Sequence, residues 1–151
     1  MKLNEKVIIY WDSSAILSAI WLDMHSENAR IALQSHAVHL ISSLAMSEVC
    51  SVLFRHGREY KANQDSVHQA YQQFLFGPWQ RLNMLPDWEM FRSMAEKWSL
   101  RGADLWHLAM AKSIAQEFPE LQVLSFDRKM LEAAEGEGLA APTSQATRER
   151  D

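Results

Sequence analysis

Residues 7–22 read VIIYWDSSAILSAIWL and decide the fold. The apolar run from Val7 to Trp11 does not alternate with polar residues and stops at Asp12, which predicts a strand buried on both faces. The serines after Asp12 and the apolar spacing from Ala15 to Leu22 predict a helix that follows the strand at once. A buried strand followed directly by a helix is typical of a parallel α/β sheet.

The rest of the chain continues to alternate helical patterns with short apolar strands. We expect helices over residues 28–36, 44–56, 59–76, 87–99 and 103–118 and after Asp127, strands over 37–41, 82–85 and 121–126, and a candidate edge strand over 139–141. Gly57 is expected to break the long helical stretch. The pattern predicts a three-layer αβα fold with a short central parallel sheet flanked by helices. We assign residues 1–142 to a single domain and residues 143–151 to a polar C-terminal tail.

Composition limits the classes of function. The chain has 151 residues, 48% of them hydrophobic, and its 15 basic and 19 acidic side chains leave a net charge of -4. That charge argues against a protein that holds nucleic acid through a general basic field. The single cysteine, Cys50, rules out a disulfide framework and suits the cytoplasm. The apolar run at residues 7–11 is too short to cross a membrane, so we expect no membrane partner.

Four acidic residues stand where catalytic groups collect in parallel α/β sheets, at the carboxyl ends of the strands. Asp12 and Asp127 each follow a predicted strand directly, and Glu48 lies on the helix after the second strand. Asp104 lies in the first turn of the helix that begins after Gly102. Each acid alone is explained as a helix cap or a solvated side chain, whereas the four together predict an acidic site.

Three short motifs, together with Glu48, carry a family resemblance. They are IYWDSSA at residues 9–15, DLWHLA at 104–109 and LSFDR at 124–128. They resemble the PIN domain, and within it the small VapC ribonuclease toxins of bacterial toxin–antitoxin pairs, over residues 7–142. The resemblance implies a PIN-like fold and a metal-dependent endoribonuclease that hydrolyses RNA. Trp11 and Trp106 are bulkier than the residues usual in the family at these positions.

The resemblance also assigns roles to individual residues. The catalytic, metal-binding acids would be Asp12, Glu48, Asp104 and Asp127, with Ser13 and Ser125 as supporting polar residues. Four carboxylates in one site repel each other unless a cation compensates them. Oxygen ligands without sulfur or a histidine pair favour Mg²⁺ or Mn²⁺ over zinc. The three aspartates would bind the ion directly or through water, and Glu48 would bind it or orient the attacking water. The serines would bind ligand waters or the phosphate.

The expected partners are an RNA substrate, a small antitoxin protein in the cleft and a second copy of the chain. Arg55, Arg58 and Arg128 are weak candidates for contacts with RNA, although most basic residues here more simply balance the acids. His107 is expected to pack or bond structurally rather than to act as a general base. Six tryptophans and several apolar helices predict more buried surface than one small core needs, as in a homodimer.

Three alternatives stay open from the sequence. A phosphatase of the haloacid-dehalogenase type also begins with an aspartate after its first strand, but it needs a second aspartate two residues on, where this chain has Ser14. A PIN fold without catalysis would be expected to have lost at least one of the four acids. A PIN nuclease of RNA processing, or one that acts on DNA, fits the residues as well as a toxin does.

Overall fold

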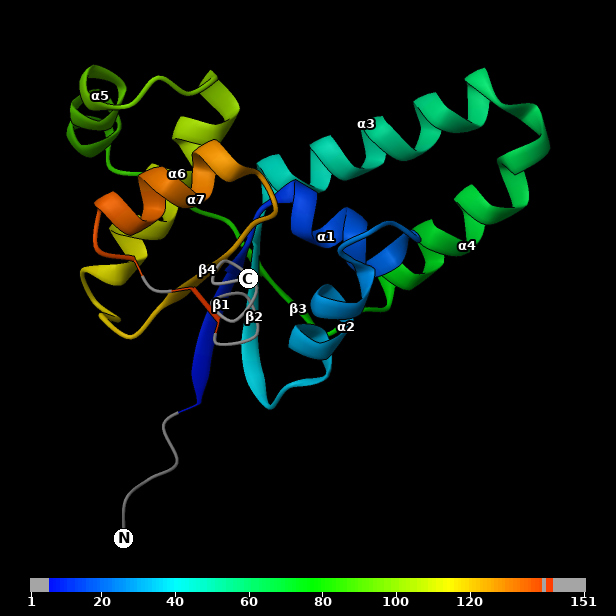
Figure 1. Cartoon of the computed structure of the whole chain (residues 1–151), viewed down its shortest axis with the longest axis horizontal. Coiled ribbons are helices and arrows are strands. Elements are labelled where there is room, and N and C mark those ends of the chain that lie inside the picture. The colour runs from blue at the N-terminus through cyan, green and yellow to red at the C-terminus, as the bar shows by residue number, and fades with distance from the viewer. Residues whose placement is uncertain (1–5, 140, 143–151) are drawn as a thin grey trace, which may run out of the picture.

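Strand β1 (Val7–Trp11) lies inside a four-stranded parallel sheet of order β3-β2-β1-β4 (Figure 1). The structure, a computed structural model, describes residues 6–139, 141 and 142. The other strands are β2 (Ala37–Ser42), β3 (Trp79–Leu82) and β4 (Gln122–Leu124). The helices are α1 (Ser13–Ile20), α2 (Ser26–Gln34), α3 (Ser43–Glu59), the 3-10 turn η1 (Lys61–Asn63), α4 (Gln64–Leu75), α5 (Trp88–Lys97), α6 (Gly102–Ala115) and α7 (Arg128–Gly136).

The register of the sheet brings three strand ends level. Trp11, the last residue of β1, pairs with Ile41 of β2 on one side and with Leu124 of β4 on the other. The residues that follow these strands therefore open onto the same edge of the sheet. This arrangement confirms that the predicted strands are parallel and end together.

Two hydrophobic cores lie between the sheet and the helices that cover its two faces. Ile9 and Trp11 point into a core shared with α1, α2, α3 and α4, whereas Tyr10 points into a second core built mainly by α6 and α7. Figure 1 shows α5, α6 and α7 on one side of the sheet and α1 to α4 on the other, with α3 and α4 projecting as an antiparallel pair. The three-layer αβα prediction is therefore confirmed, as is the prediction that both faces of β1 are buried.

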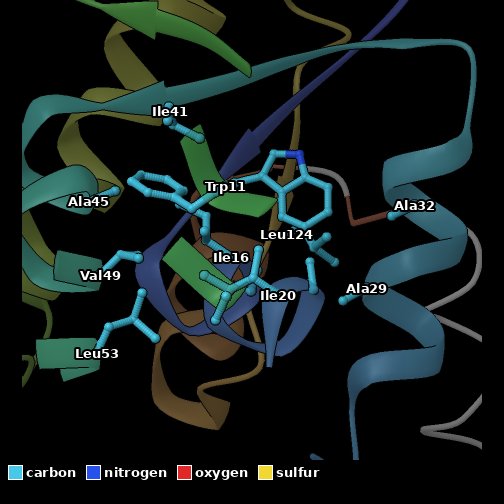
Figure 2. Close-up of a cluster of buried hydrophobic side chains, with 14 of the residues drawn as sticks. Trp11, Ile16, Ile20, Ala29, Ala32, Ile41, Ala45, Val49, Leu53 and Leu124 are labelled. Carbon is cyan, nitrogen blue, oxygen red and sulfur yellow. The ribbon is translucent and has the colours of Figure 1, made fainter. Parts of the chain in front are cut away.

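Trp11 is the largest of the fully buried side chains. Its indole lies among Ile20, Ala29, Ala32 and Leu124 (Figure 2), where the alanines of α2 leave room for the ring. The indole Nε1–H donates to Nδ1 of His39 at 3.1 Å. A buried tryptophan needs such an acceptor, so the bulky residue before Asp12 is accommodated together with its hydrogen bond.

Two predicted boundaries were wrong for reasons of packing. Helix α3 runs through Gly57 to Glu59, because packing against Val67 of α4 compensates the poor helix propensity of glycine. Strand β3 lies at residues 79–82 and not at 82–85, since pairing with residues 39–42 of β2 decides its position.

Three further boundaries differ from the predictions. Helix α1 ends at Ile20 because the next residue, Trp21, is extended. Strand β4 ends at Leu124 because the amides of Phe126 and Asp127 bond to serine hydroxyls instead of a neighbouring strand. Leu139 and Ala141 are not in a strand, and residue 140 lies outside the described residues. Within the described part of the chain, no helix has the length and apolar character needed to span a bilayer.

Gly57→Ala is predicted to stabilise the protein by about 0.5–1 kcal/mol, the usual gain from alanine in a helix interior. An added Cβ would stand 3.6 Å from the methyls of Val67, an ordinary contact. Gly136→Ala is the contrasting variant, because its Cβ would lie 2.3 Å from the indole of Trp98. That overlap should cost about 1–3 kcal/mol. Urea denaturation of both variants checks the prediction, and a destabilised Gly57→Ala protein would contradict it.

The stability of the fold is predicted to fall between pH 7 and pH 5 partly because of His39. Burial lowers the pKa of His39, against an opposing effect of backbone bonding to Ser35 and Leu33. In the unfolded chain His39 therefore binds a proton below about pH 6.5, whereas in the folded chain it does so only at a lower pH. The free energy of unfolding therefore decreases as the pH falls through this range. His39→Asn keeps an acceptor for Trp11 without the titration. Thermal unfolding should show a smaller loss in the variant than in wild type, and equal losses would refute this role.

Candidate active site at the carboxyl edge of the sheet

Asp12 is the most buried of the predicted site acids, with 4% of its surface exposed. Its Oδ1 caps helix α1 by accepting the amide of Ala15 at 3.0 Å, and it also accepts the hydroxyl of Ser14 at 2.7 Å. Burial raises the pKa of Asp12, while hydrogen bonds from Ser125, Ser14 and Ala15 and the nearby His107 lower it. These donors hold the carboxylate in place at the end of β1.

Two serine hydroxyls join the end of β1 to the end of β4. Ser14 Oγ lies 3.5 Å from Ser125 Oγ and accepts the amide of Phe126 at 3.1 Å. Ser125 Oγ accepts the amide of Asp127 at 3.1 Å. Asp127 then caps α7 through Oδ1, which accepts the amide of Met130 at 3.0 Å. Asp12 and Asp127 are thus both helix caps, and one hydroxyl network fixes the backbone between them.

Glu48 is held by a buried chain of side chains from three elements. His107 on α6, 1% exposed, places Nε2 at 2.6 Å from Glu48 Oε1 and Nδ1 at 2.7 Å from the hydroxyl of Tyr10. Burial raises the pKa of Tyr10, so the hydroxyl stays protonated and can donate to Nδ1. The Nε2–H then donates to Glu48. The prediction that His107 bonds structurally is confirmed, and its partner is one of the four acids.

Asp104 lies in the first turn of α6 and faces the other acids. Burial raises the pKa of Asp104, and the charges of Asp127 and Glu48 raise it further, whereas His107 and Arg101 lower it. His107 also acts on Asp12. His107 therefore interacts with Asp12, Glu48 and Asp104, and Asp127 interacts with Asp104, although the four acids belong to four different helices or their caps.

The donor set of this site fits a hard divalent cation. All four acids offer carboxylate oxygens, the ligands that Mg²⁺ and Mn²⁺ prefer. In the described ranges, no three His, Cys, Asp or Glu side chains stand close enough together to hold an ion. Asp127 and Glu48 nevertheless lie near enough to Asp104 for their charges to raise its pKa. Asp12, Glu48, Asp104 and Asp127 are the residues that could hold the ion.

The predicted supporting serines and RNA-contacting arginines lie at different distances from the acids. Ser125 lies in the acid site and bonds Asp12, and the second hydroxyl that bonds Asp12 belongs to Ser14 and not to Ser13. The predicted contacts of Ser13 with water or phosphate stay a prediction. Arg128 is next to Asp127 and pairs with Glu132 at 3.3 Å. Arg55 and Arg58 are exposed further along α3, on the order of 10 and 15 Å beyond Glu48 at 1.5 Å per residue.

Sequence reasoning missed three residues of the site. Tyr10 reads as an ordinary strand residue, Ser14 as a helix start, and Arg101 as a loop residue before α6. His107 carried a usable signal, because it lies one helical turn after Asp104 and so faces the same side of α6. The contact of His107 with Glu48 joins residues 59 positions apart and needs the tertiary structure.

Comparison with known proteins agrees with this fold. The chain matches the PIN domain over residues 9–136 and belongs to that family. PIN domains are generally nucleases, so the class that fold and site define is a PIN-domain protein with a nuclease fold. The structure is similar to PAE2754 from Pyrobaculum aerophilum, with a TM-score of 0.58, 17% identity and 96% of each chain covered. A search of curated proteins finds no match.

Tyr10→Phe is predicted to destabilise the protein by about 1–3 kcal/mol, because it leaves the buried Nδ1 of His107 without its partner. A double-mutant cycle with Glu48→Gln should give a coupling of about 0.5 kcal/mol or more, since His107 joins the two side chains. Tyr71→Phe, whose ring packs edge-on against Phe54, is the matched control and should change little. Urea denaturation measures each variant, and additive effects of Tyr10→Phe and Glu48→Gln would contradict the relay.

Proposed function

We propose that the chain is a Mg²⁺- or Mn²⁺-dependent endoribonuclease that hydrolyses RNA phosphodiester bonds. The observation that carries the proposal is that His107 interacts with Asp12, Glu48 and Asp104, and that Asp104 also interacts with Asp127, in a chain of the PIN family. Burial and the charges of Asp127 and Glu48 raise the pKa of Asp104, which costs stability when its carboxylate is ionised. The presence of these acids together is explained by a cation that they bind.

The proposed roles follow from how each acid is held. Asp12 and Asp127, fixed as helix caps, and Asp104, on the first turn of α6, would be ligands of the ion. When bound, the ion would lower the pKa of a water molecule and neutralise charge on the attacked phosphate. Glu48 would bind the ion or orient the attacking water, and the bond from His107 keeps its carboxylate turned to the site.

Exposure and charge support access by a polyanion. Asp127 is exposed and Asp104 and Glu48 are half-buried, so the acids reach solvent from one side. The charge of Arg101 lowers the pKa of Asp104, so a basic side chain lies close to the acids. Arg55, Arg58 and Arg128 are exposed and would contact more distant parts of the RNA. Ser13 and Ser125 would bind phosphate or ligand waters.

The proposal includes the partners of a toxin. A chain with this fold and no added domain within the described residues fits the toxin half of a toxin–antitoxin pair, acting in the cytoplasm and inhibited by a small antitoxin protein. Exposed apolar side chains at Leu85 and Trp88, 80% and 69% exposed, support a further protein contact. A second copy of the chain is the proposed occupant of such a surface. A PIN nuclease of RNA processing is the alternative with the same chemistry.

Asp104→Asn is predicted to lower RNA cleavage at least about 100-fold while leaving the protein folded, because the amide cannot replace the ligand charge. Thermal stability should stay equal or rise, since the charge that Asp127 and Glu48 repel is gone. Purified protein is incubated with total RNA in Mg²⁺ or Mn²⁺ and in EDTA, beside Asp12→Asn and wild type.

The controls separate the outcomes. Arg92→Ala, which removes an exposed side chain of α5 that pairs with Glu89 and Glu96, should retain the activity and shows that surface changes are tolerated. Full metal-dependent activity of Asp104→Asn would refute the assignment of the site. Absence of cleavage by folded wild-type protein in all conditions would favour a PIN-fold protein without catalysis or a nuclease of DNA.

A further inference from the structure

Two aromatic rings from distant parts of the chain stack face to face beside the acids. The imidazole of His25 and the phenyl ring of Phe126 have centroids 4.5 Å apart and planes inclined by 4°. Phe126 lies between Ser125 and Asp127 of the acid site, and His25 precedes helix α2. Both rings are half-buried, so part of the stack is open to solvent.

The Phe126 half of the stack is tied to the acids through its backbone. The amide of Phe126 donates to Ser14 Oγ at 3.1 Å, and the same hydroxyl donates to Asp12 Oδ1 at 2.7 Å. The ring itself packs against the core that contains Trp11. One hydroxyl therefore separates the backbone of Phe126 from the most buried acid of the site.

The His25 half is fixed by a network of short polar bonds. The amide of His25 donates to Asp23 Oδ1 at 2.7 Å, and Ser18 donates to Asp23 Oδ2 at 2.7 Å. Ser26 Oγ accepts the amide of Asp23 at 2.8 Å and donates to the carbonyl of Trp21 at 2.7 Å. These bonds order the backbone from Trp21 to Ser26, and the stack on Phe126 is the contact that orients the imidazole.

Apolar side chains extend the same connection between α1 and α2 into solvent. Leu22 is 79% exposed and Met24 is 82% exposed. A connection that serves only to join two helices has no need of a rigid imidazole stack flanked by exposed apolar groups. The combination of a flat ring, an apolar border and neighbouring acids suits a planar ligand that carries a phosphate.

We propose that the His25–Phe126 stack is a platform for one unpaired nucleobase next to the phosphodiester that the acids attack. This inference rests on the proposed function. Aromatic side chains stack on bases of any identity, so the platform would bind RNA without strong sequence preference. In a duplex the bases stack on each other and their faces are covered, so paired RNA would not use the platform.

Binding is tested with a labelled oligoadenylate and the Asp104→Asn protein in Mg²⁺, so that turnover does not interfere. His25→Ala in that protein should weaken binding of the single strand about 5- to 150-fold, the range of one lost base–aromatic stack. His25→Phe should restore it, because the ring is kept. His36→Ala, an exposed histidine just before β2 at the opposite edge of the sheet, is the matched control and should bind normally. The labelled oligoadenylate annealed to oligouridylate is a duplex, and its binding should be the same with and without the His25→Ala substitution.

The outcomes distinguish this inference from the proposed function. Equal binding by the His25→Ala and parent proteins overturns the platform, as does an absence of binding by the parent. His25 dependence of binding without cleavage by wild type would support the platform and refute the nuclease. In active protein, His25→Ala should raise KM for the single strand with little change in kcat, and an unchanged KM would refute the platform while the nuclease stands.

Discussion

The requirement that strand β1 bury both faces determines where the other elements lie. Ile9 and Trp11 point to one core and Tyr10 to the other, so helices must cover both sides of the sheet. Burial of apolar surface is the dominant favourable contribution to folding. Because β2 and β4 pair with β1 in parallel and end beside Trp11, the residues after these strands meet at one edge. The packing that buries the strand thereby also assembles the site.

The acids at this edge oppose folding, and local hydrogen bonds limit their cost. Burial raises the pKa of Asp12, and donors from Ser14, Ser125 and Ala15 act in the opposite direction. Burial and the charges of Asp127 and Glu48 raise the pKa of Asp104. Sites of this kind conflict with stability and are retained for their chemistry. His107 contributes both to stability and to the site, because it is a buried packing residue on α6 and also donates to Glu48.

Most of the predicted elements are present, and the errors concern residues whose role depends on a distant partner. Gly57 has the helix propensity of a breaker, but packing of α3 against Val67 of α4 compensates it. The position of β3 depends on pairing with β2, which local patterns do not contain. Asp12 and Asp127 were predictable, since an aspartate between a strand and a helix caps that helix through its own neighbours.

The sequence by itself determined the alternation of strands and helices, the burial of β1 and the four acids, because these follow from periodicity, capping and short motifs within a few residues. Only the tertiary structure decided that His107 joins Tyr10 to Glu48, that Ser14 bonds Asp12, and that His25 stacks on Phe126. The contacts of His107 and His25 connect residues on different elements. Their geometry depends on the register of the sheet and the crossing of the helices, which no local pattern of residues specifies.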